Sequence, residues 1–202
     1  MFESLDWWLR EHLYAVVFLG ALVDALGIPF PGRIMLITAG SFSNLTQGGA
    51  TSASIVIALA TAGTVAGDHV WYLVGRLGGR RLFETYCRVA RLSARRIAAA
   101  DRFLRRFGGL ALVLGRLAAA LRVVVTPLAV SRGMSYGRFL AFELLGAVLW
   151  AAGFVWLGWA AGALGARNGL VGTLTIVGLL GIASILMSVM ARRWFSRRVS
   201  LS

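Results

Sequence analysis

The chain has 202 residues, of which 58% are hydrophobic and 14% are charged, and its mean hydropathy is +0.77. A water-soluble protein with this balance would expose a large apolar surface, so the composition favours a membrane protein with a few spans. The formal net charge is +13, and every basic residue other than histidine is an arginine. Because the arginines adjoin apolar segments, we expect anionic lipids as partners and no nucleic acid.

Several classes of site are missing from the sequence. The single cysteine, Cys87, excludes an internal disulfide. We find no cluster with metal-ligand spacing, no Ser/His/Asp arrangement and no phosphate-binding glycine loop, so we expect no metal, no cofactor and a protein that is not an enzyme. Residues 2–12 lack a basic stretch before an apolar core, so we expect no removable signal peptide.

The first span is predicted over residues 14–28, which are apolar apart from Asp24. Residues 2–12 before it are amphipathic and rich in tryptophan, as is typical of a membrane interface.

A proline-rich break separates this span from a short apolar piece. Residues 34–40 are too few to cross the roughly 30 Å of a bilayer core. Residues 41–52 are polar and rich in glycine, and we predict a loop there. We therefore expect a re-entrant hairpin near residues 29–50, with its irregular backbone facing protein or a wet cavity. The residues expected to set its geometry are Pro29, Pro31, Gly32 and Gly40.

The next segments are a full span and a basic stretch. Residues 54–74 are long enough to cross the membrane, and Gly63 and Gly67 give them a small-residue face for close helix packing. Residues 76–106 carry ten arginines and two acids, and their apolar residues recur at helical spacing. We expect two basic amphipathic helices lying on the membrane surface there. A soluble nucleic-acid-binding insert is the weaker alternative, since the stretch is short.

Residues 108–133 place Arg116 and Arg122 inside an apolar run. A charge near the bilayer centre costs roughly 2.5–3.5 kcal/mol on insertion scales, so such residues usually face a cavity or a partner. In an unbroken helix the two arginines would point about 120° apart. A bend at Pro127, or packing, would let them converge, and we expect a second re-entrant hairpin. The alternative is a plain spanning helix whose arginines reach the surface.

Two more spans are predicted at residues 136–162, which contain Glu143, and at residues 170–190. If the basic stretches are cytoplasmic, the positive-inside bias places both termini in the cytoplasm. One span then separates the two hairpins, so they enter from opposite faces. We expect one all-α polytopic membrane domain over residues 1–202, with four full transmembrane helices, two oppositely entering re-entrant hairpins arranged as an inverted repeat, and basic interfacial amphipathic helices.

Three motifs in order resemble the DedA family of membrane proteins (the VTT or SNARE-associated domain group), over roughly residues 20–160. They are Asp24 followed by Pro29-Phe30-Pro31-Gly32-Arg33 and Ala39-Gly40; then Gly63, Gly67-Asp68, Tyr72, Gly75-Arg76 and Gly79; then Gly115-Arg116, Arg122, Ala129, Met134, Phe139, Gly146 and Trp150.

The chain departs from the family pattern at four positions. Arg33 stands where the family usually has a carboxylate, and Glu143 stands where asparagine is common. Ala119 replaces a proline between the two arginines, so the bend is expected to come from packing or from Pro127. Val130 replaces a glycine.

The resemblance implies lipid movement across the bacterial cytoplasmic membrane, as a flippase for undecaprenyl phosphate. Arginine suits a phosphate headgroup because its planar fork donates two parallel hydrogen bonds. We expect Arg116, Arg122 and Arg33 to bind the headgroup. We expect Asp24, Asp68 and Glu143 either to carry a coupling proton or to form ion pairs that hold the hairpins together.

The sequence is also compatible with other functions. A low-selectivity phospholipid scramblase and a non-catalytic scaffold that docks partners on residues 76–106 are the alternatives, and a lipid-phosphate hydrolase is disfavoured because neither histidine lies near a carboxylate in a hydrolase pattern. Proton or sodium coupling and a homodimer are further candidates.

Overall fold

The computed structural model describes residues 2–28, 30–45, 49–77, 88, 94–116, 119–165, 175, 178–179, 181–183 and 186, and these contain helices and no strand. The helices that it bounds are α1 (Phe2–Ala25), α2 (Gly32–Leu45), α3 (Gly49–Leu77), α5 (Ala94–Phe107), α6 (Leu110–Gly115), α7 (Ala119–Ser131) and α8 (Tyr136–Gly165). The all-helical expectation is thus confirmed for the part of the chain that the structure describes.

Two helices are long and apolar enough to cross a membrane: α3 and residues Tyr136–Leu164 of α8. They coincide with the second and third predicted spans and extend each of them by a few residues. In α1 the apolar part is the shorter stretch His12–Ala25. Most of the predicted span at 170–190 lies outside the described residues.

The chain divides into two compact units. Unit 1 comprises residues 1–67 and 147–185, and unit 2 comprises residues 68–146 and 186–202. The long helices α3 and α8 contribute residues to both units, while α1 and α2 belong to unit 1 and α5, α6 and α7 belong to unit 2.

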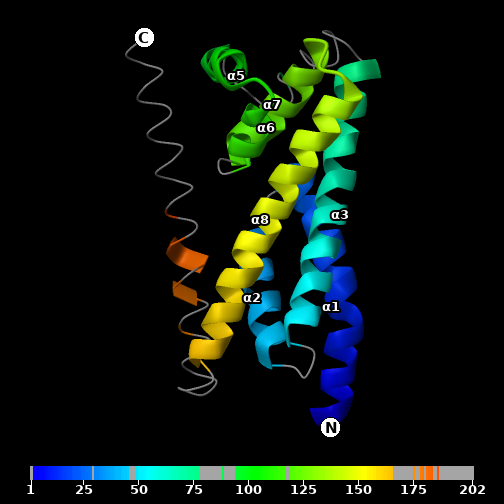
Figure 1. The fold of residues 1–202 in the computed structure, drawn as a ribbon, viewed down its shortest axis with the longest axis vertical. Coiled ribbons are helices and arrows are strands. Elements are labelled where there is room, and N and C mark those ends of the chain that lie inside the picture. Colours follow the sequence, from blue (N-terminus) through cyan, green and yellow to red (C-terminus); the bar gives the residue numbers. More distant parts are fainter. Residues whose placement is uncertain are drawn as a thin grey trace. The chain divides into compact units, whose positions relative to one another are not determined.

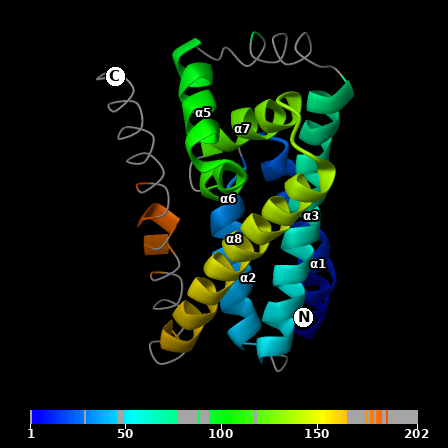
Figure 2. The same cartoon turned by 45° about the horizontal axis from the view of Figure 1, so that its top comes forward.

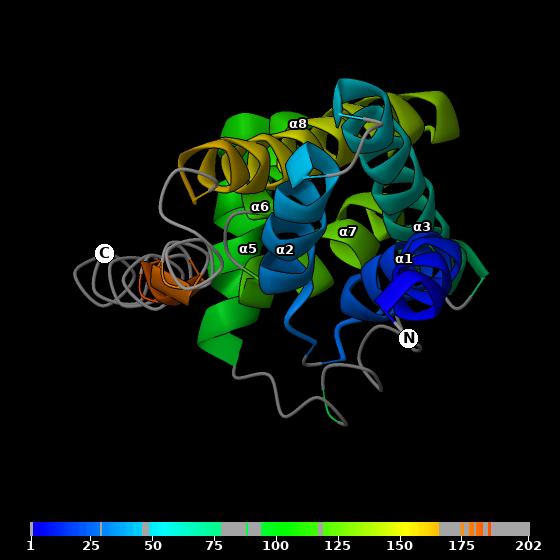
Figure 3. The ribbon, with the colours of Figure 1, turned by 90° about the horizontal axis from the view of Figure 1, so that it is seen from below.

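In unit 1 the helix backbones approach one another closely at glycines. An added Cβ at Gly63 of α3 would lie 2.3 Å from the carbonyl oxygen of Phe18 in α1. An added Cβ at Gly40 of α2 would lie 2.1 Å from the carbonyl oxygen of Val155 in α8. Figure 1 and Figure 3 show α2 running beside the C-terminal half of α8. The predicted small-residue face of α3 therefore does pack against another helix.

The break between α1 and α2 lies at the proline-rich segment, where the sequence predicted it. Helix α1 ends at Ala25, Gly27 has a positive φ of 83°, and α2 begins at Gly32 directly after Pro31. Pro29 lies outside the described residues. Helix α2 has 14 residues, or about 21 Å, and is therefore shorter than a bilayer core.

The prediction of a polar loop over residues 41–52 is largely wrong. Helix α2 continues to Leu45 and α3 begins at Gly49. The hydroxyl of Ser43 donates a hydrogen bond of 2.9 Å to the carbonyl of Ala39, and Ser41 and Ser43 are both buried. Serines that bond back to their own helix in this way do not end it, which is why the polar composition misled the prediction.

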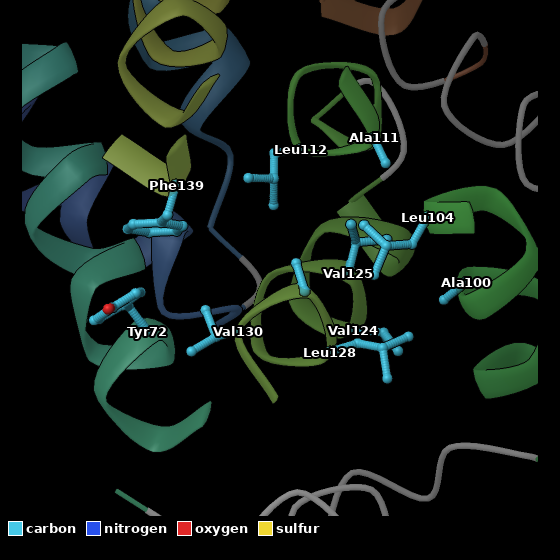
Figure 4. Packing of buried hydrophobic residues seen from close by; sticks show 11 residues of the cluster. Tyr72, Ala100, Leu104, Ala111, Leu112, Val124, Val125, Leu128, Val130 and Phe139 are labelled. Atoms are coloured by element: carbon cyan, nitrogen blue, oxygen red, sulfur yellow. The ribbon is translucent and has the colours of Figure 1, made fainter. Parts of the chain in front are cut away.

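Unit 2 has its own apolar core, to which α5, α6 and α7 all contribute. Figure 2 shows α5 beside α6 and α7. In the close view of Figure 4, Ala100 and Leu104 of α5 point toward α7. The other buried members of this cluster are Tyr72, Ala111, Leu112, Val124, Val125, Leu128, Ala129, Val130 and Phe139.

Helix α5 is basic and amphipathic, as predicted, but its apolar face packs against α6 and α7. Exposed Arg102, Arg105 and Arg106 lie on its outer side. Asp101 forms ion pairs with Arg105 and with Arg132, just past the end of α7. Contact with the membrane surface stays a prediction, and residues 78–87 and 89–93 lie outside the described residues.

The bend in the second hairpin is not at Pro127, and that expectation is corrected. Pro127 lies inside α7, which continues to Ser131, whereas α6 ends at Gly115 with Arg116 as its C-cap and α7 begins at Ala119. Proline within a membrane helix is tolerated where neighbouring groups compensate for the lost hydrogen bond. Here α3 packs closely, since an added Cβ at Gly75 would lie 2.9 Å from the Pro127 carbonyl oxygen.

Replacing Gly40 by alanine should destabilise the protein by about 1–3 kcal/mol, because the new methyl group would overlap the backbone of α8 and force the helices apart. Thermal unfolding in detergent measures this effect. Gly153→Ala is the matched control, since an added Cβ there meets nothing within 4 Å. Equal melting temperatures for the two variants would contradict the close packing of α2 on α8.

Candidate functional site: a buried ion cluster in unit 2

Three charged side chains meet in unit 2, each from a different helix. Asp68 comes from α3, Arg116 from the end of α6, and Glu143 from α8. All three side chains are at most 2% exposed. The cluster therefore joins segments that are 27 to 75 residues apart in the sequence.

Both carboxylates contact the same nitrogen of the arginine. Nη2 of Arg116 donates a hydrogen bond of 2.9 Å to Oδ2 of Asp68. The same Nη2 forms an ion pair with Oε1 of Glu143. Charge-assisted contacts of this kind are roughly twice as strong as hydrogen bonds between neutral groups.

Gly146 gives the arginine room to lie against α8. A Cβ at this position would approach Nε of Arg116 to 3.0 Å and its Cδ to 3.1 Å. Glu143 and Gly146 are three residues apart and thus share one face of α8. One turn of α8 therefore supplies both a counter-charge and the space for the guanidinium.

The cluster offsets the cost of burying charge. A buried ion without a partner costs several kcal/mol, and an ion pair repays that cost only when its geometry is good and its polar groups are satisfied. Ionisable groups inside membrane helices usually face one another and mark functional sites. Three of them at one point make this cluster the strongest candidate site among the described residues.

An aromatic group formed by α3 and α8 lies next to the acids along both helices, and its members are His69, Tyr72, Tyr136 and Phe139. Nε2 of His69 and the hydroxyl of Tyr136 share a hydrogen bond of 3.0 Å. The rings of Tyr72 and Phe139 lie 4.8 Å apart, centroid to centroid. Nη1 of Arg76 donates a hydrogen bond of 2.9 Å to the Tyr72 hydroxyl. The sequence interpretation did not identify this group, although Tyr72 and Phe139 stand four residues from Asp68 and Glu143 respectively.

Asp24 and Arg33 belong to unit 1. The Cγ of Asp24 would lie 3.2 Å from a Cβ built on Gly32, so its carboxylate lies against the first turn of α2, where the helix dipole favours an anion. The guanidinium carbon of Arg33 lies 5.7 Å from the ring centroid of Phe154. This distance is within the range of a cation–π contact.

Arg122 lies in the first turn of α7, and its side chain is outside the described part of the structure. Arg116 is the C-cap of α6 and Arg122 belongs to α7, so the two arginines lie at different helices. The 120° separation expected of an unbroken helix therefore does not apply to them.

Among the described residues, no group of three or more His, Cys, Asp or Glu side chains could hold a metal ion. The three charged groups of the cluster are arranged around a guanidinium, a group whose planar donors match the geometry of carboxylates and phosphates.

Replacing Arg116 by methionine should destabilise the protein by about 3–5 kcal/mol, because it leaves two buried carboxylates without the guanidinium that both of them contact. The combined variant Arg116→Met, Asp68→Asn and Glu143→Gln removes all three charges and should recover most of that loss. Thermal unfolding in detergent compares the two variants. A triple variant as unstable as the single one would show that the cluster is not held by its charges.

Comparisons with known proteins agree with this architecture. The VTT domain matches residues 30–160 of the chain, which include all of α2, α3 and α5–α7 and most of α8. No solved structure matches the chain.

Relatives are found in several bacteria. An uncharacterized membrane protein of Synechocystis is 32% identical over 74% of this chain and 67% of its own length. An uncharacterized membrane protein of Mycobacterium tuberculosis is 36% identical over 70% and 65%. Protein DedA of Escherichia coli is 29% identical over 73% and 68%. The chain spans about two thirds of the length of these relatives. With the family match over most of its length, the chain belongs to the DedA family of VTT-domain membrane proteins.

Proposed function

We propose that this protein moves an anionic lipid carrier, undecaprenyl phosphate, between the leaflets of the bacterial cytoplasmic membrane. The observation that carries the proposal is the cluster of Asp68, Arg116 and Glu143, buried between helices of a membrane protein. A guanidinium that only stabilised the fold would be a costly choice in such a place, because apolar side chains of similar volume stabilise buried positions as well or better.

The chemistry of the arginines supports a phosphate as the ligand. Their planar guanidinium groups match the phosphate oxygens and keep their charge when buried. The polyprenyl tail needs no polar partner and can stay in the lipid while the head crosses. In this proposal the head is bound by Arg116 at the end of α6 and by Arg122 in the first turn of α7. Arg33 at the start of α2 is a third phosphate ligand.

The topology completes the proposal. The hairpins near residues 29–50 and 108–133 are re-entrant and enter from opposite faces, and both termini are cytoplasmic. Three findings support this arrangement: α2 is too short to span, α6 and α7 are two short helices, and α3 between the two hairpins is long enough to cross. The bacterial relatives that are named as membrane proteins support the location.

Transfer of a labelled polyprenyl phosphate between leaflets of liposomes that contain the purified protein tests the proposal. The variant Arg116→Ala plus Arg122→Ala should slow transfer about 100- to 10,000-fold, since each of the two lost hydrogen bonds to a charged group is worth about 1.5–3 kcal/mol. Arg102→Ala plus Arg106→Ala removes two exposed arginines of α5 and should leave the rate unchanged.

Wild-type protein that transfers the lipid no faster than empty liposomes overturns the proposal. So does an arginine variant that folds, as judged by its melting temperature, and still transfers at the wild-type rate. Equal transfer of phosphatidylethanolamine would identify a low-selectivity scramblase instead.

A further inference from the structure

Arg116 is already occupied by carboxylates of the protein itself. Its Nη2 accommodates both Asp68 and Glu143, so two negatively charged groups converge on one nitrogen. Like charges this close to each other repel one another. An anionic ligand that reaches this guanidinium adds a third anion, so one carboxylate must withdraw or be neutralised.

Glu143 is the carboxylate better suited to withdraw. Both carboxylates form ion pairs with Nη2, but only Asp68 also accepts a hydrogen bond from it, whereas Oε1 of Glu143 has no hydrogen-bond partner among the described residues. The glutamate side chain has one more rotatable bond than aspartate and can swing away while its helix stays in place. Gly146 lies on the same face of α8 and has no side chain that would crowd the guanidinium.

We propose that the Glu143 carboxylate occupies the anion-binding position of Arg116 in the unliganded protein, and that a phosphate head displaces it while Glu143 takes up a proton from water. The inference rests on the proposed function, because it assumes that a lipid phosphate binds to Arg116. It assigns to Glu143 the role of a positioning residue, which acts through the arginine.

The charge balance of the exchange is simple. The phosphate oxygen replaces the Glu143 oxygen on Nη2, and the proton makes the displaced carboxyl neutral, so one added negative charge is offset. Binding and proton uptake are then linked, and affinity rises as the pH falls. One linked proton changes the affinity by at most about tenfold per pH unit.

Few other groups near the cluster can bind or release a proton. Besides Asp68, the described titratable side chains next to the cluster on α3 and α8 are His69, Tyr72 and Tyr136, and Arg76 lies beyond Tyr72. On α6 the charged group is Arg116 itself, and on α7 it is Arg122, whose side chain is not described. Substitution of Glu143 therefore separates its contribution from that of the histidine.

Calorimetry with farnesyl phosphate as the probe tests the exchange. Titrating the detergent-solubilised full chain in two buffers of different ionisation enthalpy gives the number of protons taken up on binding. Between about pH 7.5 and 8.5 a phosphate monoester, whose second pKa is about 6, keeps its charge, so the protein supplies the change. We expect about one proton for the wild type and close to zero for Glu143→Gln.

Two further variants are controls. Asp101→Asn removes a carboxylate of unit 2 that lies outside the cluster and should keep the wild-type proton uptake. Glu143→Asp retains a carboxylate with a shorter reach and should retain the uptake too. Glu143→Gln should also bind the probe more tightly than the wild type at pH 8, about 10-fold, because the competing anion is gone.

The outcomes separate the two claims. Binding by the wild type without proton uptake overturns the exchange, as does equal uptake by wild type and Glu143→Gln, and either result leaves phosphate binding intact. If neither the wild type nor Glu143→Gln binds farnesyl phosphate, the proposed function fails and the exchange fails with it. Because the wild-type result is decisive alone, a Gln variant that does not fold does not remove the test.

Discussion

The guanidinium of Arg116 sets the main physical constraint on unit 2. An arginine at this depth among apolar helices must have counter-charges within reach, since its burial without them would cost several kcal/mol. Asp68 and Glu143 supply them from α3 and α8. The end of α6 is thereby fixed to both long helices.

Glycine makes this arrangement possible in both units. In unit 2, Gly146 leaves space for the arginine side chain and Gly75 lets α3 approach α7. In unit 1, Gly40 and Gly158 let α2 lie against α8 with backbone atoms in contact. Such packing suits a membrane protein, in which helices associate through close van der Waals contact rather than by escape from water.

The sequence predicted well those features that depend on local composition. Apolar length located α3 and α8, and the prolines and Gly32 located the start of α2. It failed where tertiary contacts override local preference: Ser41 and Ser43 read as loop residues yet lie buried in α2, and Pro127 lies within α7. Asp68 and Glu143 were recognised as buried acids, but no spacing along the chain could show that both would meet Arg116, because that depends on how three separate helices pack.

The exchange of Glu143 for a lipid phosphate is the claim that ties the fold to its proposed function. Electron cryomicroscopy of the protein with bound polyprenyl phosphate tests it most directly. We predict density for the phosphate against the guanidinium of Arg116, with Asp68 still in contact and the Glu143 carboxyl displaced. Phosphate density elsewhere, with Arg116 still held by both carboxylates, would contradict the proposal.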